Sequence, residues 1–358
     1  MKQSFYPLKI SDLRRETAEC VSIGFAVPAE HRAVFSFKPG QHLTLKAVVK
    51  GEELRRSYSI CSAPQDHELR VAIKKIEGGA FSSFANDELR VGDTLEVAPA
   101  DGHFTLALNP LQEKHYLMIA AGSGITPILS LTKTILETEP KSRVSLIYGN
   151  RTRATIIFKS DLEALKNRHL TRLSLFHVLS RERAEAPFLA GRIDAQKCAH
   201  IVEKLIPVES IDEALLCGPE EMILTARDVL AQQGLPAKNI HFELFFSGKA
   251  KALQAAREKQ GAVGPTSQIT LVLDGVETNF DLAQGGESLL DAALRSGADL
   301  PYACKGGVCA TCRANIQEGE VEMDVNYSLD EDEIRRGFVL TCQAHPKSAK
   351  VRVNFDIK

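Results

Sequence analysis

The sequence has little net charge and no long apolar run, and both absences exclude classes of function. Lysine and arginine number 44 against 46 aspartates and glutamates, which gives a net charge of -2 over 358 residues. This balance gives no reason to expect nucleic acid or an anionic membrane as a partner. The most apolar stretch, residues 116–131, is broken by Gly122, Gly124 and Pro127 and is shorter than the roughly 20 residues of a transmembrane helix.

Two further kinds of signal are missing. The first 20 residues contain no continuous apolar region of the kind found in secretory signals, so we expect a cytoplasmic protein with reduced thiols. No histidine and carboxylate motif for a di-iron centre and no haem-attachment motif occurs. The sequence therefore offers no site for oxygen chemistry of its own.

Four of the 8 cysteines have the spacing of an iron-sulfur site. Cys304, Cys309 and Cys312 lie in the loop "YACKGGVCATC", and Cys342 follows in "GFVLTCQAHP". A Cys-x4-Cys-x2-Cys motif with a distant fourth cysteine is the plant-type [2Fe-2S] pattern. The two glycines after Cys304 permit tight turns that aim backbone N–H groups at the sulfurs.

Zinc is the alternative for these thiols, although only Cys309 and Cys312 have the Cys-x-x-Cys spacing that zinc sites favour. A zinc-binding chain would be a structural or regulatory partner instead of an electron carrier. His345, three residues beyond Cys342, is expected at the surface and not as a ligand. The cysteines that match no motif are expected in the core as small apolar side chains; they are Cys20, Cys61 and Cys198.

Four segments differ in pattern. Residues 1–108 contain short strands separated by turns, which predicts a small antiparallel β-barrel. Residues 109–246 alternate apolar strands with amphipathic helices, which predicts a parallel α/β sheet with helices on both faces. Residues 247–266 are small and polar and predict a linker that could contain a short helix. Residues 267–358 carry 15 acidic and 9 basic residues, a net charge of -6, which leaves +4 for residues 1–266.

Unusual residues follow the strands predicted in the α/β segment, where ligands of such sheets bind. Gly122 and Gly124 follow the first strand, and Pro127 can begin the next helix. The Gly-x-Gly-x-x-Gly fingerprint is incomplete, because Pro127 occupies the third glycine position and no acidic residue follows about 20 positions later. An ordinary tight turn is therefore the alternative.

Later strand ends carry Arg151, Ser180 and Arg181, which can converge on an anion such as the 2'-phosphate of NADPH. The alternative is that these are solvated loop charges, so NADH stays possible as the nucleotide. The fourth strand ends at Cys217.

The barrel segment contains two candidate flavin motifs. In "RRSYSI", Arg56 and Tyr58 alternate along one strand and share a face, with Ser59 beside them. In "GGAFSSFA", Gly79 and Ser82 lie at a predicted helix N-terminus, which favours a pyrophosphate. Each motif taken alone could be ordinary strand and turn chemistry.

These motifs, with "AAGSGITPILS", "YGNRT" and "CGP", occur in the order found in the ferredoxin-NADP reductase superfamily fused to a C-terminal plant-type ferredoxin. The chain resembles that superfamily over nearly its whole length, and within it the reductase components of multicomponent di-iron monooxygenases. The resemblance implies an FAD-binding antiparallel barrel, an NADP-binding α/β domain and an α+β ferredoxin domain of β-grasp type.

The resemblance also implies roles for individual residues. The residues that it assigns to FAD are Arg56, Ser57, Tyr58, Ser59, Val71, Ile73, Lys74, Gly78, Gly79, Ser82 and Phe245. The residues that it assigns to the nicotinamide dinucleotide are Gly122, Gly124, Thr126, Pro127, Cys217 and Gly218, beside Arg151, Ser180 and Arg181. It gives catalytic positions to Ser59 near the flavin N5, to Cys217 beside the nicotinamide and to Glu243 over the flavin. Cys304 and Cys309 would hold one iron, and Cys312 and Cys342 the other.

These expectations combine into an electron-transfer function. A nicotinamide gives up two electrons as hydride, whereas a di-iron oxygenase accepts them singly, and FAD followed by a [2Fe-2S] cluster converts one into the other. The sequence therefore predicts a path from NADPH through both cofactors to a di-iron oxygenase partner. The alternatives are the zinc protein above, an enzyme with its own substrate pocket, and the same chemistry serving another aromatic-ring or alkane oxygenase.

The linker and the acidic run at 330–333 are expected to affect how the cluster domain docks on the flavin-binding part of the chain. A flexible chain of about 20 residues would hold its ends roughly 25 Å apart on average, which favours repeated loose docking. The run "DEDE" is expected either to form a docking patch or to begin a helix.

Overall fold

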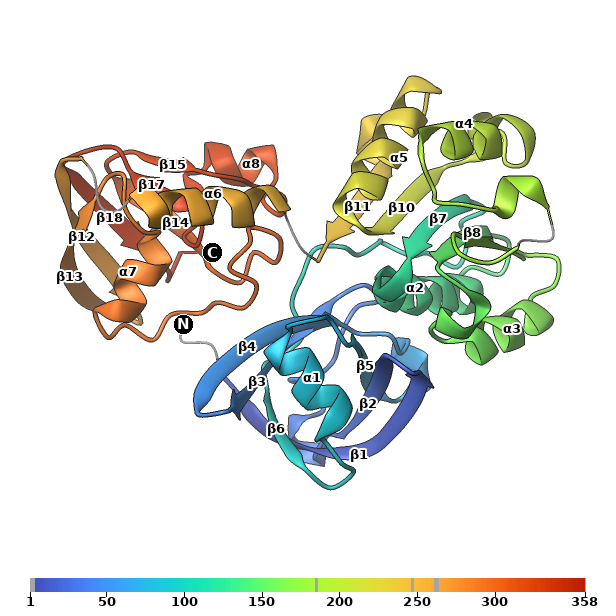
Figure 1. The fold of residues 1–358 in the computed structure, drawn as a ribbon, viewed down its shortest axis with the longest axis horizontal. Coiled ribbons are helices and arrows are strands. Elements are labelled where there is room, and N and C mark those ends of the chain that lie inside the picture. Colours follow the sequence, from blue (N-terminus) through green and yellow to red (C-terminus); the bar gives the residue numbers. More distant parts are fainter. Residues whose placement is uncertain (1–3, 184–185, 246–247, 261–263, 358) are drawn as a thin grey trace. The chain divides into compact units, whose positions relative to one another are not determined.

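The computed structural model describes residues 4–183, 186–245, 248–260 and 264–357 (Figure 1). The chain forms two compact units: a larger unit, Tyr6–Leu244, and a C-terminal unit that comprises Phe245–Lys358 and the segment Met1–Phe5. The predicted domain boundary at 246–247 lies outside the described residues, and the predicted boundaries stay predictions. In the described part of the chain, no helix has both the length and the apolar character needed to cross a membrane.

The larger unit begins with a six-stranded antiparallel barrel in the order β4-β3-β6-β1-β2-β5. Its strands are β1 (Tyr6–Thr17), β2 (Cys20–Ala26), β3 (His42–Val49), β4 (Glu52–Ser59), β5 (Leu69–Lys74) and β6 (Thr94–Val97), and its helix is α1 (Ala80–Asp87). A bridge between Ile60 and Val71 joins the two edge strands. The predicted antiparallel barrel is therefore confirmed.

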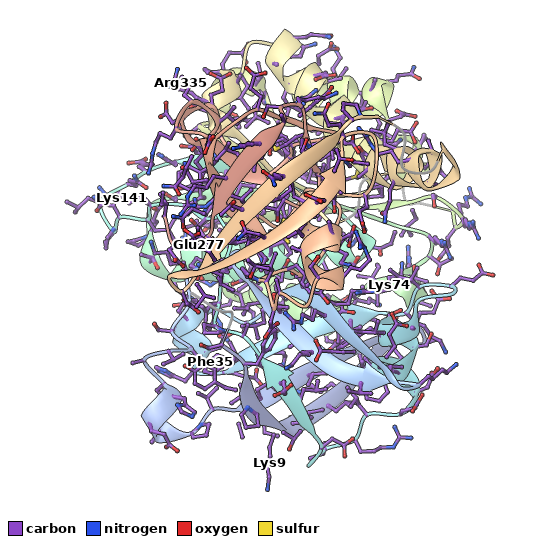
Figure 2. All side chains as sticks on the ribbon, turned by 90° about the vertical axis from the view of Figure 1, so that its left-hand side faces the viewer. Lys9, Phe35, Lys74, Lys141, Glu277 and Arg335 are labelled. Atoms are coloured by element: carbon purple, nitrogen blue, oxygen red, sulfur yellow. The ribbon has the colours of Figure 1, made fainter. Side chains whose placement is uncertain are left out.

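Alternation of side chains builds the barrel core. Along β1, Leu8 and Ile10 are buried, whereas Lys9 between them projects from the outer surface (Figure 2). Val71 and Ile73 of β5 are fully buried in the same core. Because successive strand residues face opposite sides, one apolar residue in every two is enough to fill the interior.

The second part of the larger unit is a parallel sheet in the order β11-β10-β7-β8-β9. The strands are β7 (His115–Ala121), β8 (Arg143–Asn150), β9 (Leu173–Leu179), β10 (Glu213–Gly218) and β11 (Ile240–Leu244). The helices are α2 (Ile125–Thr138), α3 (Lys159–Arg168), α4 (Ala195–Lys204) and α5 (Glu220–Gln232). The helices α4 and α5 cover one face of the sheet and α2 and α3 the other (Figure 1), which confirms the predicted α/β class.

The barrel and the parallel sheet share contacts through α2. The hydroxyl of Ser130 donates a hydrogen bond of 2.6 Å to the carbonyl of Ser62, and Lys133 forms an ion pair of 3.0 Å with Asp66. Cys61 of the barrel also belongs to the apolar core that packs against α2. The prediction that the cysteines without a motif lie in the core is confirmed, since Cys20, Cys61 and Cys198 are all buried.

The C-terminal unit contains a five-stranded mixed sheet in the order β13-β12-β18-β14-β16 and a two-stranded sheet of β15 and β17. The strands are β12 (Thr266–Leu273), β13 (Val276–Ala283), β14 (Arg313–Glu318), β15 (Val321–Met323), β16 (Phe338–Leu340), β17 (Ala344–Pro346) and β18 (Lys350–Asn354). The helices are α6 (Gly248–Gln260), α7 (Leu289–Arg295) and α8 (Glu331–Arg335). The adjacent strands β12 and β18 pair in parallel, and their other neighbours are antiparallel. This is the predicted α+β arrangement.

Two local expectations are settled in this unit. The short helix that the predicted linker could contain is present as α6, so the condition of a flexible chain of about 20 residues does not hold for residues 248–260. The run at 330–333 begins a helix: the Asp330 side chain accepts a hydrogen bond from the backbone N–H of Glu333, which completes a capping box. Glu333 is itself buried and paired with Arg313.

Candidate active site and cluster site

The three predicted catalytic residues come together near the carboxyl ends of β10 and β11. Cys217 of β10 is aligned with Glu243 of the neighbouring parallel strand β11. The Ser59 hydroxyl at the end of β4 donates a hydrogen bond of 3.0 Å to the Glu243 carboxylate, across 184 residues of sequence. Burial, with the Glu243 carboxylate nearby, raises the pKa of the Cys217 thiol well above its usual value. The thiol is therefore neutral and has no nucleophilic role at neutral pH.

The glycine loop after β7 approaches this group closely. A Cβ at Gly124 would lie 2.1 Å from the Cys217 carbonyl oxygen, so only glycine fits there. Gly122 has a φ of +53°, and its carbonyl accepts a hydrogen bond of 2.9 Å from the Tyr148 hydroxyl. Thr126 is buried, and its hydroxyl bonds to the carbonyl of Ser123 at 3.0 Å. The loop is thus fixed against β10 before α2 begins.

Pro127 and Gly218 lie at the same carboxyl-end edge of the parallel sheet. Pro127 is buried in the first turn of α2, where its missing N–H leaves no bond unmade. A Cβ at Gly218 would lie 2.7 Å from Met222 and 3.1 Å from the backbone nitrogen of Ala121, so the end of β10 also needs a small residue.

Lys74 brings a cation from the barrel to this loop. It ends β5 and is labelled in Figure 2. A Cβ placed at Gly122 would lie 3.6 Å from the Lys74 ammonium nitrogen, with no other atom within 4 Å. An ammonium group beside the N-terminus of α2 gives a positive environment that suits a phosphate group.

The strand residues predicted to contact FAD occupy β4. Arg56 is exposed, and its guanidinium donates to the Arg55 carbonyl at 2.7 Å. Tyr58 is half-buried, and its ring lies 5.7 Å from that of Phe81. Burial raises the pKa of the Tyr58 phenol, so it stays neutral. Among the described residues, the buried Ser57 hydroxyl has no hydrogen-bond partner, and a bound ligand with polar oxygens would satisfy it.

Other predicted FAD contacts have local structural roles. The side chains of Val71 and Ile73 lie in the barrel core, so only their backbones could face a ligand. The Ser82 hydroxyl donates to the Gly79 carbonyl and accepts from the Ile76 N–H, each at 3.1 Å. These two bonds hold the turn before α1, where Gly78 has a φ of +71° and open space around it.

The basic residues predicted to bind an anion lie at adjacent strand ends. The Arg181 N–H donates to the Arg151 carbonyl at 2.8 Å, and the Ser180 N–H donates to the Asn150 carbonyl at 2.9 Å. Arg151, Ser180 and Arg181 are all exposed, and neither guanidinium has a partner within the described ranges. Phe245, directly after β11, is 39% exposed.

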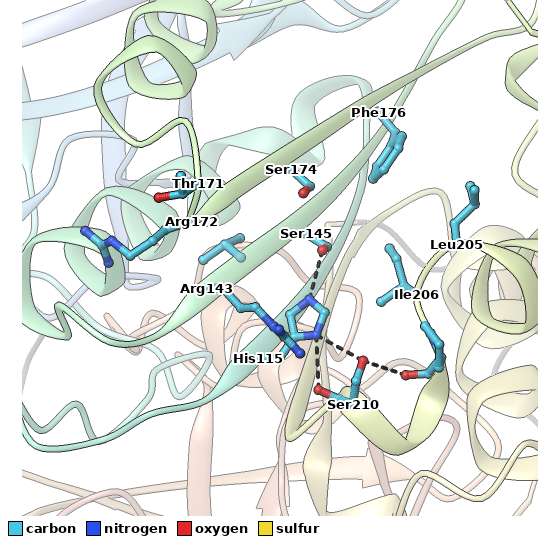
Figure 3. Close-up of a pocket in the computed structure, with 12 residues that line it drawn as sticks. His115, Arg143, Ser145, Thr171, Arg172, Ser174, Phe176, Leu205, Ile206 and Ser210 are labelled. Atoms are coloured by element: carbon cyan, nitrogen blue, oxygen red, sulfur yellow. Dashed lines mark hydrogen bonds between the residues drawn. The ribbon is translucent and has the colours of Figure 1, made fainter.

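A separate pocket opens at the opposite end of the parallel sheet (Figure 3). His115 and Arg143 are the first residues of β7 and β8, and both line it. The His115 ring bonds to the Ser145 hydroxyl at 2.8 Å and to the Ser210 carbonyl at 3.0 Å. Burial lowers the pKa of His115, so its ring is neutral. This pocket is distinct from the carboxyl-end group and contains none of the predicted site residues.

The four motif cysteines gather in the C-terminal unit. Cys304 is partly exposed, whereas Cys309, Cys312 and Cys342 are buried. The nearby Cys309 thiol and the N–H groups of Gly306 and Val308 lower the pKa of Cys304, whereas the nearby Cys304 thiol and burial raise the pKa of Cys309. The nearby Cys312 thiol and burial raise the pKa of Cys342. The four thiols lie near one another, since Cys342 also acts on Cys304 and Cys309 also acts on Cys342.

The loop geometry explains why glycine is needed between these thiols. Gly307 has a φ of +74°, and a Cβ there would lie 3.0 Å from Val325 and 3.1 Å from Gln343. The Gly306 N–H donates to the Cys304 sulfur at 3.3 Å, as the sequence predicts. The Gln343 amide lies 3.6 Å from the Cys342 sulfur and donates to the Lys305 carbonyl at 3.1 Å.

Gln343 and His345 show what sequence reasoning missed. The expected surface position of His345 is wrong: the side chain is 3% exposed and its Nε2 lies 3.1 Å from the Asp324 carboxylate. Within the described ranges, no three or more His, Cys, Asp or Glu side chains surround one point that could hold a single ion. A [2Fe-2S] cluster instead takes two thiolates on each of its two irons.

Family models match all three parts of the chain. An oxidoreductase FAD-binding domain matches residues 7–106, an oxidoreductase NAD-binding domain residues 118–228, and a 2Fe-2S iron-sulfur cluster binding domain residues 271–347. The chain is 44% identical, over 99% of both sequences, to one of the subunits of the 1,2-phenylacetyl-CoA epoxidase of Escherichia coli. The chain belongs to the ferredoxin-NADP reductase superfamily with a C-terminal [2Fe-2S] ferredoxin.

A second curated relative and two solved structures also match this chain. The chain is 35% identical to the ferredoxin reductase component of 3-ketosteroid-9-alpha-monooxygenase from Rhodococcus rhodochrous, covering 97% of this chain and 96% of that protein. Among solved structures, phthalate dioxygenase reductase shares the fold, with a TM-score of 0.61, 22% identity and 98% of both chains covered. A self-sufficient cytochrome P450 monooxygenase gives a TM-score of 0.72 at 20% identity, with 98% of this chain and 41% of that chain covered.

These findings establish an oxidoreductase that uses FAD, a nicotinamide nucleotide and a [2Fe-2S] cluster. The residues present fit these groups. The orphaned Ser57 hydroxyl and the Lys74 ammonium suit a phosphate-bearing flavin and nucleotide, and the four neighbouring thiols suit a two-iron cluster.

Proposed function

We propose that the chain carries electrons from NADPH through FAD and the [2Fe-2S] cluster to a di-iron oxygenase. The acceptor we propose is phenylacetyl-CoA epoxidase, acting in aerobic phenylacetate degradation in the cytoplasm. The observation that carries this proposal is the 44% identity to the epoxidase component of Escherichia coli, which extends over 99% of both chains. The segments "PGQHLTLKA", "GEELRRSYSIC" and "MDVNYSLDEDE" of this chain support the same assignment.

The chemistry of the site supports this direction of flow. When bound, FAD can accept two electrons as hydride and release them singly, which a cluster can carry onward. Ser59 and Glu243 would hold a hydrogen bond beside the flavin N5, and the neutral Cys217 would border the nicotinamide. Arg56, Tyr58 and the turn at 78–82 would bind the flavin, while the loop at 122–127 and Gly218 would bind the nucleotide.

In the C-terminal unit, Cys304 and Cys309 would ligate one iron, and Cys312 and Cys342 the other. The proximity of Cys309 to Cys304 and of Cys312 to Cys342 supports this assignment. Cys304 is the most exposed of the four, so electrons would leave for the oxygenase on its side of the cluster.

The acceptor is tested by reconstitution. The purified reductase is mixed with the oxygenase components of phenylacetyl-CoA epoxidase, and NADPH-dependent oxygen consumption is measured with phenylacetyl-CoA present and absent. We expect substrate-dependent turnover with matching product formation. Turnover only with a different oxygenase, such as a 3-ketosteroid-9-alpha-monooxygenase, would retain the electron path and overturn the proposed acceptor.

We expect a preference for NADPH over NADH that depends on Arg181. A charge-assisted hydrogen bond to a 2'-phosphate contributes about 1.5 to 3 kcal/mol, which corresponds to a factor of roughly ten or more. Arg181→Ala should therefore lower kcat/KM for NADPH about tenfold or more and leave the value for NADH nearly unchanged, measured by steady-state reduction of ferricyanide.

Arg143→Ala is the matched control, because it removes the same charge from the opposite end of the same sheet. It should leave both values unchanged. Equal kcat/KM for the two nucleotides in the unaltered reductase would contradict the assignment of a 2'-phosphate site.

A further inference from the structure

Helix α6 is held against the ferredoxin fold by an ion pair. The Arg257 guanidinium donates from Nη2 to Asp324 Oδ1 at 2.5 Å and from Nε to Oδ2 at 3.1 Å. Ala250, in the first turn of the helix, is 5% exposed. A helix of 13 residues is marginally stable alone in water, so docking of this kind is what makes it persist.

The partner carboxylate is nearly buried, which strengthens the pair. Asp324 is 10% exposed, and its backbone N–H donates to the Gln343 carbonyl at 2.9 Å. Burial alone would raise the pKa of Asp324, but the hydrogen bond from Arg257 and the charges around it hold that pKa below its usual value. Burial and the nearby guanidinium lower the pKa of His345, whose ring also lies 3.1 Å from the Asp324 carboxylate.

The helix also covers the side of the domain where a cluster ligand lies. A hollow of about 470 Å³ lies between α6 and the ferredoxin fold, beside the ion pair. Ala250, Gln254 and Arg257 line it from the helix, and Cys342 and His345 line it from the ferredoxin fold. The docked helix is therefore part of the surroundings of Cys342.

Docking of α6 shortens the connection between the two units. With the helix in place, only residues 245–247 separate Leu244, the end of β11, from Gly248. The four Cα–Cα steps from Leu244 to Gly248 reach about 14 Å at full extension. If α6 were released, residues 245–265 would precede β12, and a flexible chain of 21 residues has a mean span of about 25 Å.

We infer that Arg257 is a positioning residue for electron transfer from flavin to cluster, acting by docking α6 on the ferredoxin fold. The inference rests on the proposed electron path. It adds that the docked helix leaves only three residues of sequence, 245–247, between the end of β11 and the start of α6, and so limits how far the cluster can move from the flavin. A sevenfold longer connection would lower the effective concentration of the two units by up to about twentyfold, from the power law for flexible chains.

The test compares Arg257→Gln with the unaltered reductase by stopped-flow spectroscopy and by hydrogen exchange. Flavin reduction by NADPH should be unchanged, flavin-to-cluster transfer should slow by about threefold to twentyfold, and the α6 amides should exchange faster, with or without the cluster. Arg257→Lys should restore part of the rate. The iron content and the visible absorption of the cluster should not change, which shows that the cluster is still present.

Two further variants make the result specific. Arg352→Gln removes the same charge from an ion pair of 2.5 Å with Glu277, an exposed surface residue labelled in Figure 2, and should alter neither quantity. Arg257→Gln combined with Asp324→Asn avoids an uncompensated buried carboxylate and should behave like Arg257→Gln alone. Unchanged exchange in α6, or faster exchange with an unchanged transfer rate, would overturn the inference. Failure of the proposed electron path would show differently, as no transfer from flavin to cluster in the unaltered protein.

Discussion

Replacing Cys309 with serine should abolish the [2Fe-2S] cluster and leave reduction of FAD by NADPH largely intact. Cys309 lies in the C-terminal unit, whereas the predicted flavin and nucleotide residues, except Phe245, lie in the larger unit. A serine hydroxyl is a poorer ligand for iron than a thiolate, so the cluster would lose one of its four ligands. Iron content, visible absorption and stopped-flow flavin reduction measure the two effects separately.

Cys198→Ser is the matched control, because Cys198 is a buried cysteine of α4 outside the motif. This variant should keep its iron and its visible spectrum. The modular interpretation would be contradicted if Cys309→Ser also lost FAD or could no longer be reduced by NADPH.

Gly124→Ala should lower the stability of the protein and its rate of flavin reduction more than an alanine at any other position of the loop. The new Cβ would lie 2.1 Å from the Cys217 carbonyl oxygen and 2.7 Å from the Gly218 nitrogen, so two backbone segments must separate. Overpacking on this scale costs about 2 to 4 kcal/mol. We expect a lower melting temperature and at least a tenfold slower flavin reduction at subsaturating NADPH, about 1.4 kcal/mol in the barrier.

Gly122→Ala is the matched control, because it tests the effect of a positive φ without the steric clash. At Gly122 the nearest atom to a new Cβ is 3.6 Å away, although the φ of +53° still disfavours alanine by about 1 to 2 kcal/mol. Both variants should keep the cluster. If Gly124→Ala lost no more stability or rate than Gly122→Ala, the close approach to Cys217 would not be the constraint.

The cluster motif and the fold class could be predicted because their signals are local. The spacing of Cys304, Cys309 and Cys312 lies within one loop, and strand alternation and helix periodicity act over a few residues. The same locality made Asp330 recognisable as a possible helix start. The assignment of Ser59 and Glu243 to one site needed the family resemblance, because no local pattern joins residues 184 positions apart.

The misplacement of His345 has the same physical origin. Its buried position depends on Asp324 and, through Asp324, on Arg257. These three residues belong to three separate segments that meet only in the folded unit. The sequence of α6 permits a helix, but nothing in its composition identifies the carboxylate that receives Arg257. Likewise, nothing local predicts that Lys74 of the barrel ends beside Gly122 of the α/β sheet.

The contacts of α2 with the barrel make ligand binding a shared thermodynamic property. Ser130 and Lys133 of this helix bond to Ser62 and Asp66, and its first turn begins at the glycine loop. A ligand that binds only the folded state stabilises every part that must unfold to release it. FAD bound by the barrel would thus also raise the free energy of opening the nucleotide loop. A reductase made in a cell short of riboflavin would therefore bind less FAD and would also bind its nicotinamide nucleotide more weakly.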